Sequence, residues 1–323
     1  MSLPEMSIIV LVPETCTAVM PGIRSLRDQT VRQALEIILV GASRASMDVD
    51  EKELRGFHRF QVVELGTSFT NAHARAAGVR SASAPVVYFL EDHAFPFPDW
   101  AEHLIAEHRA GWAGVGAEIM NANPGSFTSW ANLVMAFGCW MEKQAEGEHG
   151  RIPPHNSAYK KEVLLGYGDE LENRLASESL MQDDLLRHGH RFYLQPKARI
   201  AHLNISRFQS FLLEQYSGGR WFGASRCMGW SFPKRAAYGA AFPLISLKRF
   251  FESLDMIRRA SMRKRLFPGV LPPLAVGLLV HSFGEAMGYV FGPGNAEELS
   301  MLLEFSHDRH LCSRDANWRE SRE

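Results

Sequence analysis

A short apolar run at residues 86–90 ends abruptly in three polar side chains, Glu91, Asp92 and His93. The run is rich in β-branched and aromatic residues, and its length suits a strand that is buried on both faces of a sheet. Open α/β sheets bind their ligands beyond the carboxyl ends of their strands. We therefore expect a largely parallel sheet with a ligand site at residues 91–93.

The residues before this run alternate between strand-like and helix-like patterns. Such alternation predicts βαβ crossovers, and hence an α/β fold with a single, mostly parallel sheet flanked by helices. Pro21 suits a first helical turn, and the alanines of 72–77 suit a helix that packs closely on the sheet. The expected strands cover 8–12, 37–40, 60–64 and 86–90, and the expected helices cover 21–29 and 71–81.

The pattern after Trp100 is more irregular and becomes helical from about residue 208. From it we expect three parts: an α/β catalytic domain over 1–220, a helical extension over 221–305 and a loosely held polar tail over 306–323. Within the first part, helices are expected at 100–109, 159–166 and 170–187, and strands at 114–119, 191–194 and 198–203, the last two near the sheet edge.

Composition limits the partners of the chain. Its 323 residues are 46% hydrophobic with a net charge of −1, which suits a globular protein and argues against nucleic acid as a partner. No charged region followed by a cleavage site opens the sequence, so we expect a cytoplasmic location. The cysteines are widely scattered and form no CxxC pair, so neither a disulfide framework nor a thiolate zinc site is expected. They are Cys16, Cys139, Cys227 and Cys312.

The C-terminal region pairs a basic segment with an apolar one. Residues 248–265 carry seven Lys or Arg, and residues 266–292 are largely apolar. Three prolines, His281 and Glu285 interrupt the apolar stretch, which argues against a straight membrane span. Two interpretations stay open: an interfacial or re-entrant helical pair at a membrane surface, and a helical appendage on the main core.

Several motifs in register are typical of one enzyme family. The strand at 8–12 runs into Pro13, Glu14 and Thr15; Ala74-Arg75-Ala76-Ala77-Gly78 matches an Ala-Arg-Asn-Ala-Gly helix motif; and Glu91-Asp92-His93 is followed by Pro96 and Trp100. From about Ser7 to Trp221 the chain resembles the family-2 glycosyltransferases of the A-type fold. The resemblance implies a Rossmann-like sheet and inverting transfer of a sugar from a nucleotide-sugar donor to a hydroxyl acceptor.

The resemblance also implies a donor site with a divalent metal, Mn²⁺ or Mg²⁺. Glu91, Asp92 and His93, here called the acidic triplet, correspond to the metal motif, with His93 in place of the usual third aspartate. The implied metal ligands are Asp92, His93 and His202. A mixed carboxylate and imidazole set suits manganese better than magnesium. The implied donor-binding residues are Pro13, Glu14, Thr15, Gly41, Arg75, Glu91 and Asp92.

The base that deprotonates the acceptor hydroxyl is, by the same resemblance, Glu178. It stands about eleven residues before Gly189, where the family carries the second acid of a Glu-Asp pair, but Ser177 takes the place of the first. Asp183 and Asp184 compete for the role.

A saccharide or lipid-linked acceptor is expected near Asn156, Asp169, Arg220 and Trp221. Asp169 lies in a Gly-Tyr-Gly-Asp-Glu turn and either binds a sugar hydroxyl or caps the next helix. Arg220 and Trp221 loosely resemble the Gln-x-x-Arg-Trp motif of processive synthases in this family. An alternative role for Trp221 is that of a core residue near a helix start.

Two positions depart from the family pattern: Gly41-Ala42-Ser43 replaces an aspartate-bearing turn, and Ala76 replaces an asparagine. Another nucleotide, a lipid-phosphate donor or an inactive nucleotide-sugar-binding scaffold therefore stays open. A nucleotidyltransferase is a further alternative, although no glycine-rich loop with a lysine follows the first strand. The last alternative is a zinc hydrolase whose metal ligands are His188, His190 and His202.

Overall fold

The computed structural model describes residues 3–12, 14–141, 144–259, 263–304 and 307–316. Two compact units make up the chain. The first comprises residues 1–120 and 144–201, and the second comprises residues 121–143 and 202–323.

The first unit is built on a sheet whose amino-terminal half is parallel. Its strands are β1 (Met6–Val12), β2 (Leu35–Gly41), β3 (Arg59–Glu64) and β4 (Val86–Leu90), in the spatial order β3-β2-β1-β4. Every residue of β1, β2 and β4 is buried, as near-continuous apolar runs predict. The α/β fold with a sheet flanked by helices is confirmed.

Beyond β4 the sheet becomes mixed. Strand β8 (Ser157–Lys160) runs antiparallel to both β4 and β6 (Gly114–Asn121). The order continues through β9 (Phe192–His202) to β5 (Ala94–Pro96), and β7 (Gly147–His149) pairs with β9. Because β8 enters the sheet in the reverse direction, residues just before it lie at the same edge as residues just after β4.

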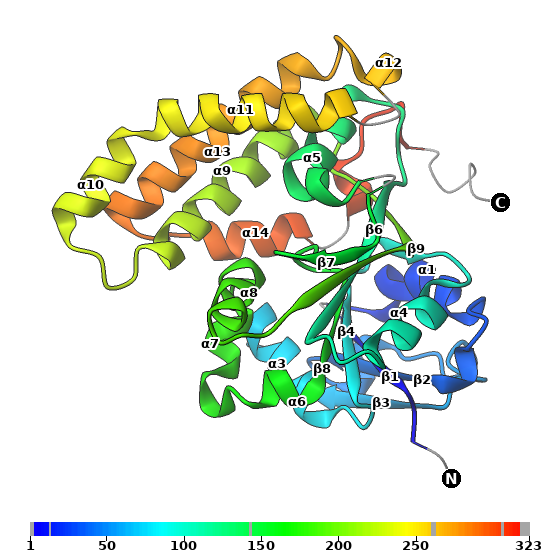
Figure 1. The fold of residues 1–323 in the computed structure, drawn as a ribbon. Coiled ribbons are helices and arrows are strands. Elements are labelled where there is room, and N and C mark those ends of the chain that lie inside the picture. The colour runs from blue at the N-terminus through cyan, green and yellow to red at the C-terminus, as the bar shows by residue number, and fades with distance from the viewer. Residues whose placement is uncertain (1–2, 13, 142–143, 260–262, 305–306, 317–323) are drawn as a thin grey trace. The chain divides into compact units, whose positions relative to one another are not determined.

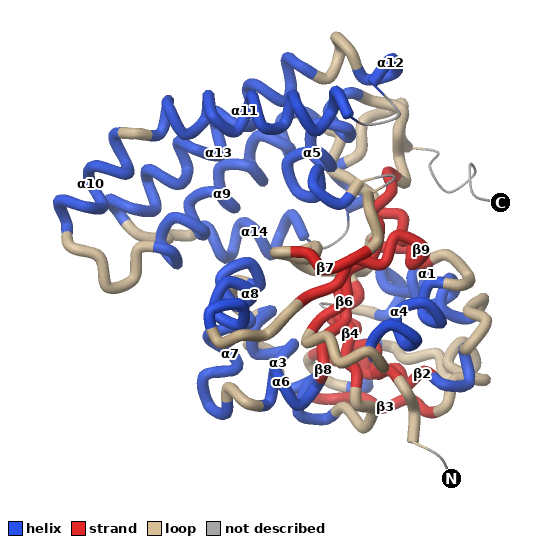
Figure 2. Tube along the Cα trace, viewed as in Figure 1, coloured by secondary structure: helices blue, strands red, loops and turns tan. Residues whose placement is uncertain are grey.

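Helices cover both faces of this sheet. Figure 1 shows α1 (Cys16–Arg27) and α4 (Trp100–His108) on one side, and α3 (Asn71–Ser81) with α6, α7 and α8 on the other. In Figure 2 the strands, in red, run between the two groups. The remaining short elements of this unit are α6 (Lys161–Leu165), α7 (Leu171–Leu175), α8 (Glu178–Arg187), α2 (Arg44–Met47), η1 (Arg32–Ala34) and η3 (Gly168–Glu170).

Several element boundaries differ from the prediction. Helix α1 begins at Cys16, so Pro21 lies inside the helix rather than in its first turn, and one backbone hydrogen bond is lost there. The helix predicted over 159–166 is wrong at its start, because Tyr159 and Lys160 belong to β8. The two strands predicted around Pro196 form one strand, β9, close to the sheet edge, where a proline is tolerated.

The second unit is helical. Its elements are α5 (Phe127–Phe137), η2 (Gly138–Trp140), α9 (Phe208–Arg226), α10 (Phe232–Ala240), α11 (Phe242–Arg259), α12 (Arg263–Leu266), α13 (Leu271–Phe291), α14 (Ala296–Glu304) and η4 (His307–His310). Helices α9, α11 and α13 lie side by side (Figure 1). The predicted domain boundary at residue 220 falls inside α9, whereas the compact units divide at 201–202 and assign α5 to the helical unit, where it packs on α13.

Glycines let α9 and α13 approach closely. A Cβ on Gly219 would overlap the carbonyl oxygen of His281, and one on Gly288 would overlap that of Arg220. Such backbone contact is available only to glycine, which has no side chain. Helix α13 therefore occupies the centre of this unit.

Helix α13 is long and apolar enough to cross a membrane by length and composition, and 44% of its apolar window is buried inside the structure. It also packs against α5, α9, α10 and α11, as the core helix of a helical unit does. Length and composition therefore do not by themselves indicate a membrane span.

The polar C-terminal segment is packed over its described part. Asp315 is buried and accepts hydrogen bonds from the Gly125 backbone and the Ser126 hydroxyl, each at 2.8 Å. His307 and Leu311 are also buried. The prediction of a loosely held tail is therefore wrong for residues 307–316, and residues 317–323 lie outside the described part.

Candidate active site

The acidic triplet lies directly beyond the carboxyl end of β4. Glu91 and His93 are buried, and Asp92 is half-buried. Nδ1 of His93 lies 2.7 Å from Oδ1 of Asp92, and Nε2 lies 3.7 Å from Oε2 of Glu91. The Asp92 carboxylate thus holds one ring nitrogen of His93, and the other nitrogen faces Glu91.

A second carboxylate, that of Glu178, is buried in the same unit at the first residue of α8. Nη1 of Arg75 donates to its Oε1 at 3.0 Å, and the backbone N–H of His155 donates to its Oε2 at 3.1 Å. Arg75 comes from α3 and also lies over the ring of Phe89. Two segments far apart in the sequence therefore converge on Glu178.

Tyrosine and glutamine side chains complete the surroundings of Glu178. The Tyr159 hydroxyl donates to its Oε2 at 3.1 Å and accepts from the Gln182 amide at 2.7 Å. Gln182 accepts in turn from the backbone N–H of Ile152. Burial and then the Glu178 charge raise the pKa of Tyr159 well above its usual value, so the phenol stays a hydrogen-bond donor.

His155 lies between the carboxylates of Glu178 and Glu91. Its Nδ1 lies 3.2 Å from Oε1 of Glu178, 3.8 Å from Oε1 of Glu91 and 2.8 Å from Nη2 of Arg75. Its neighbour Asn156 donates an amide hydrogen to Glu91. The side chain of His155 is 39% exposed, whereas both carboxylates are buried. The imidazole is thus the part of this cluster that solvent or a ligand can reach.

The backbone at His155 and Asn156 is unusual. Their φ angles are 58° and 49°, in the left-handed region that non-glycine residues rarely adopt. Consecutive residues in this conformation store strain that the surrounding contacts must hold, and such strain clusters at functional sites. The turn aims Asn156 at Glu91 and His155 at Glu178.

The charges in the cluster favour an ionised Glu178 carboxylate. Burial by itself would raise the pKa of Glu178, but the charge and hydrogen bonds of His155 and the charge of Arg75 lower it below its usual value. Burial and Arg75 lower the pKa of His155, but the carboxylates of Glu178 and Glu91 outweigh them and raise it. Glu178 therefore remains a carboxylate at neutral pH.

Comparison with known proteins identifies the family of the domain that contains most of this cluster. Residues 7–167 match the family model described as glycosyl transferase family 2. This segment, about half of the chain, is a glycosyl transferase family 2 domain. The matched residues contain Arg75, the acidic triplet and His155, so most of the cluster lies inside the glycosyltransferase domain.

A curated relative supports the same assignment. The chain is 30% identical over 107 residues to a protein of Bacillus subtilis (strain 168) named "Putative glycosyltransferase EpsH". The aligned part is 32% of this chain and 30% of that protein, so the chain spans less than a third of its relative. Together with the family match, this confirms the resemblance to family-2 glycosyltransferases.

The predicted donor loop of the glycosyltransferase domain follows β1. Pro13 lies outside the described residues, and Glu14 and Thr15 are exposed just before α1. Gly41 ends β2 opposite Val12, and a Cβ there would lie 2.6 Å from the carbonyl oxygen of Val12. The glycine is therefore required for packing, whatever its part in donor binding.

The competing carboxylates are already engaged. Asp183 forms a two-pronged ion pair with Arg151, at 2.8 and 2.6 Å. Asp184 accepts from the Tyr167 hydroxyl at 3.0 Å and pairs with Arg187. Within the described contacts, neither aspartate joins the cluster around Glu178.

Asp169 lies apart from this cluster in the contacts described. It is exposed in η3, and the carbonyl of its neighbour Gly168 accepts from Arg80 near the end of α3. His188 is exposed and bonds to the Asp184 carbonyl, and no described contact joins it to His190. The zinc-hydrolase alternative therefore gains no support from the described contacts.

Three predicted residues belong to the second unit. His202 ends β9, is buried, and pairs through Nδ1 with Oδ1 of Asn204 at 3.0 Å. Arg220 donates to the carbonyl of Gly292 at 3.0 Å, and Trp221 is half-buried on α9. Their roles in ligand binding stay predictions.

The triplet at β4 fits a divalent metal. Asp92 holds Nδ1 of His93, which leaves Nε2 as the ring nitrogen with a lone pair, the arrangement usual around ligating histidines. Oε2 of Glu91 and Nε2 of His93 lie 3.7 Å apart, so both can bind one ion at about 2.1 Å. A carboxylate and imidazole donor set suits Mn²⁺.

Sequence reasoning missed His155 as a member of the site. The neighbouring Asn156 was predicted as an acceptor residue, but His155 itself matches no family motif, and its left-handed conformation is visible only in the folded chain. The adjacent Pro-Pro-His-Asn segment is a turn signal, which is the one local indication of an unusual backbone.

Proposed function

We propose that this protein is an inverting glycosyltransferase that moves a sugar from a nucleotide-sugar donor to a hydroxyl acceptor, with Glu178 as the base. The observation that carries the proposal is the cluster of Arg75, His155 and Glu178 beside the acidic triplet of a family-2 domain. Its carboxylate is ionised and is oriented by partners from separate elements, so it can accept a proton at neutral pH.

In this mechanism the residues of the cluster have separate roles. Arg75 and His155 keep Glu178 unprotonated, and Tyr159 and Gln182 orient it. The acceptor hydroxyl approaches over the exposed ring of His155, and its proton passes to Glu178 as its oxygen attacks the anomeric carbon. Departure of the nucleoside diphosphate breaks the donor bond on the opposite side, which inverts the configuration.

A divalent ion belongs to the proposal as well. Asp92 and His93, with Glu91, would hold it, and His202 is a predicted further ligand. When bound, the ion neutralises the charge that develops on the diphosphate leaving group. Mn²⁺ suits the donor set best, and Mg²⁺ is the alternative.

Titration with nucleoside diphosphates tests donor binding. We expect one nucleotide of a panel to bind in the presence of Mn²⁺ and the Asp92→Ala variant to lose that binding. Asp28→Ala, a change at an exposed aspartate at the end of α1, is the matched control and should bind like the wild type. Binding that is unaffected by Mn²⁺ and by Asp92→Ala would contradict the metal-dependent donor site.

Turnover distinguishes the enzyme from an inactive nucleotide-sugar-binding scaffold. With the donor that the titration identifies, we expect release of nucleoside diphosphate rather than pyrophosphate, and loss of that release in Glu178→Gln. Asp183→Asn removes a half-buried carboxylate from the same helix and is the control. Nucleotide binding without turnover in the wild type would favour the scaffold, and pyrophosphate release would favour a nucleotidyltransferase.

We further propose peripheral contact with the cytoplasmic face of a membrane, where a lipid-linked or polysaccharide acceptor would be met. Leu244, Leu247 and Phe251 are 71%, 53% and 59% exposed and share one face of α11. Lys248 is exposed beside them, and basic and apolar side chains on one helix favour an anionic bilayer surface.

Sedimentation with vesicles tests this contact. We expect more binding to vesicles that contain anionic phosphatidylglycerol than to pure phosphatidylcholine vesicles, and less binding by Leu247→Gln. Leu165→Gln, a change at an exposed leucine of the first unit, is the control. Equal binding to both vesicle types would contradict the membrane proposal while leaving glycosyl transfer intact.

A further inference from the structure

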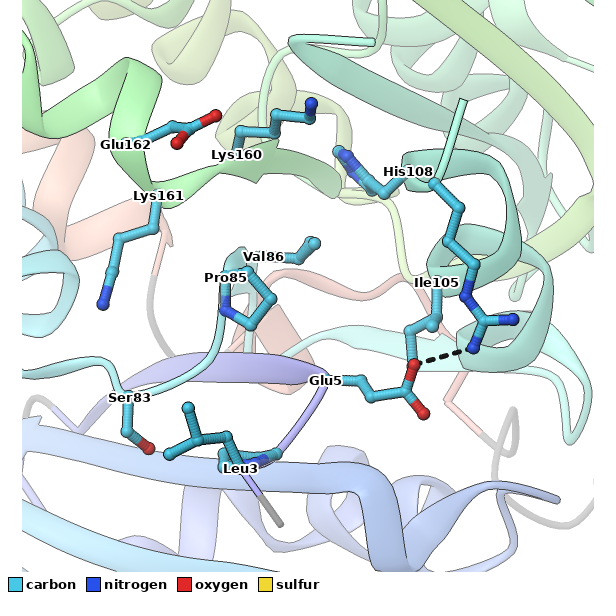
Figure 3. A pocket seen from close by; sticks show the side chains of 12 residues that line it. Leu3, Glu5, Ser83, Pro85, Val86, Ile105, His108, Lys160, Lys161 and Glu162 are labelled. Atoms are coloured by element: carbon cyan, nitrogen blue, oxygen red, sulfur yellow. Dashed lines mark hydrogen bonds and ion pairs between the residues drawn. The ribbon is translucent and has the colours of Figure 1, made fainter. Parts of the chain in front are cut away.

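A cavity lies at the end of the sheet opposite the candidate active site. It is lined by Glu5, which precedes β1, by Pro85 and Val86 at the start of β4, and by Lys160 at the end of β8 (Figure 3). The candidate active site lies at the other end of β4. Five strand residues therefore separate the two, a distance of about 17 Å at 3.3 Å per residue.

The cavity has the size and the lining of a small-molecule site. Its volume is about 680 Å³, within the range of ligand pockets in proteins. Apolar side chains form much of its wall, and charged side chains lie on several sides of it (Figure 3). The apolar contributors are Leu3, Pro4, Pro85, Val86 and Ile105.

The charged side chains around the cavity carry a net charge of +1. Arg109 pairs with Glu5 at 2.8 Å, which Figure 3 marks as a dashed line. Lys161 donates to the carbonyl of Ala82 at 3.0 Å. Lys160 has no ion-pair partner among the described residues, and three basic side chains face two acidic ones, Glu5 and Glu162.

His108 supplies a buried polar group to the cavity wall near Lys160. It is only 5% exposed, and neither ring nitrogen makes a well-aligned hydrogen bond within the described part of the chain, although the carbonyl groups of Ala158 and Trp112 lie near the ring. Burial and then the charge of Lys160 lower the pKa of His108 to about 3, although nearby carbonyl groups act in the opposite direction. The ring is therefore neutral and keeps one N–H to donate. In Figure 3 it points toward Lys160.

A buried donor without a well-aligned partner is costly to a folded protein, and a ligand that accepts from it lowers that cost. A carboxylate oxygen between Lys160 and His108 would accept from both and match the single positive charge. The apolar wall would then cover the rest of the ligand.

We propose that this cavity binds a small amphipathic carboxylate, with its charged group between Lys160 and His108 and its apolar body against Pro85, Val86 and Ile105. The site is separate from the proposed sugar transfer and does not depend on it. It would give the chain a second small-molecule ligand.

Calorimetric titration with octanoate, below its micelle concentration, tests the proposal. Octanol has the apolar body without the charge, and acetate has the charge without the body. We expect octanoate to bind at least tenfold more tightly than either. Equal affinity for octanol, or no measurable octanoate binding, would overturn the proposal.

Variants identify the location. We expect Lys160→Gln to weaken octanoate binding about tenfold, and Lys52→Gln, at an exposed lysine of the same unit, to leave it unchanged. Asp92→Ala should also bind octanoate like the wild type, so failure of the glycosyltransferase proposal and failure of this one are distinguishable. Unchanged affinity in a folded Lys160→Gln variant would overturn the assignment.

A measurement on the wild-type protein guards against a variant that fails to fold. The ring resonance of His108, identified by its loss in His108→Gln, should shift as octanoate is added and stay unmoved with octanol. Octanoate binding that leaves this resonance unmoved would overturn the placement beside His108.

Discussion

Two buried glutamates, one in each unit, have the same kinds of partner and differ in how those partners are brought together. Glu178 in the first unit is bonded to Arg75, His155 and Tyr159. Glu285 in the second unit is bonded by Arg249 and lies 3.3 Å from His281 and 3.2 Å from the hydroxyl of Tyr289.

The difference lies in sequence distance and backbone. His281 and Tyr289 stand four residues before and after Glu285 on one helix, so a regular helix places them there. The partners of Glu178 come from α3, a strained turn and β8, and the turn leaves His155 partly exposed. A local arrangement neutralises a charge inside a helical core, whereas the non-local one leaves a partly exposed imidazole beside a buried carboxylate.

The largest expected contrast is in turnover. Glu178→Gln should lower the rate of nucleoside diphosphate release by at least about a hundredfold, since a base contributes roughly 10²–10⁴ in rate. Glu285→Gln should leave turnover per folded molecule unchanged, because its partners lie within the helical unit. Steady-state kinetics on both variants measure this. Equal losses would remove the distinction between the two glutamates.

Acid unfolding should measure how much the ionised Glu285 stabilises the fold. The pKa of Glu285 is lowered from 4.5 to about 2: burial opposes this shift, but His281 and Arg249 outweigh it. A lowered pKa stabilises the fold above pH 4.5, and that contribution is lost as the pH falls toward 2, by about 3 kcal/mol in all. The free energy of unfolding in urea between pH 5 and 2 should therefore fall less steeply in Glu285→Gln. A slope equal to that of the wild type would contradict the ion pair.

Removing the arginine alone should have a smaller effect. Arg249→Met leaves Glu285 with His281 and Tyr289, and we expect a loss of about 2 kcal/mol because Arg249 is partly exposed. Lys248→Met removes the neighbouring exposed cation and should change the free energy of unfolding by less than about 0.5 kcal/mol. Urea unfolding at pH 7 compares them, and equal losses would mean that the buried pair is not what stabilises α13.

The smallest expected effect concerns His155. His155→Asn keeps a residue that tolerates the left-handed backbone but removes the imidazole. Its charge lowers the pKa of Glu178, so without it Glu178 should protonate at a higher pH. We expect the acidic limb of the pH–rate profile to move to higher pH. His188→Asn, at an exposed histidine, is the control, and an unmoved limb would argue against coupling of His155 to Glu178.

The sequence by itself determined the parallel half of the sheet and the place of the acidic triplet. The apolar runs of β1, β2 and β4 are buried along their whole length, so their composition and length indicate them without any knowledge of distant partners. Helix α3 was predicted with the bounds that the structure has, because Asn71 follows a capping threonine and small residues fill its interior. The family motifs lie in this part and identified the enzyme class.

Only the tertiary structure decided what surrounds Glu178 and how the later strands join the sheet. Tyr159 was expected in a helix and belongs to β8, because pairing with β4 and β6 overrides the local helical preference. His155 had no motif, and its position depends on a left-handed turn between an arginine eighty residues earlier and a glutamate twenty-three residues later. Local sequence patterns report local backbone preference, whereas ion pairs between distant segments exist only once the chain has folded.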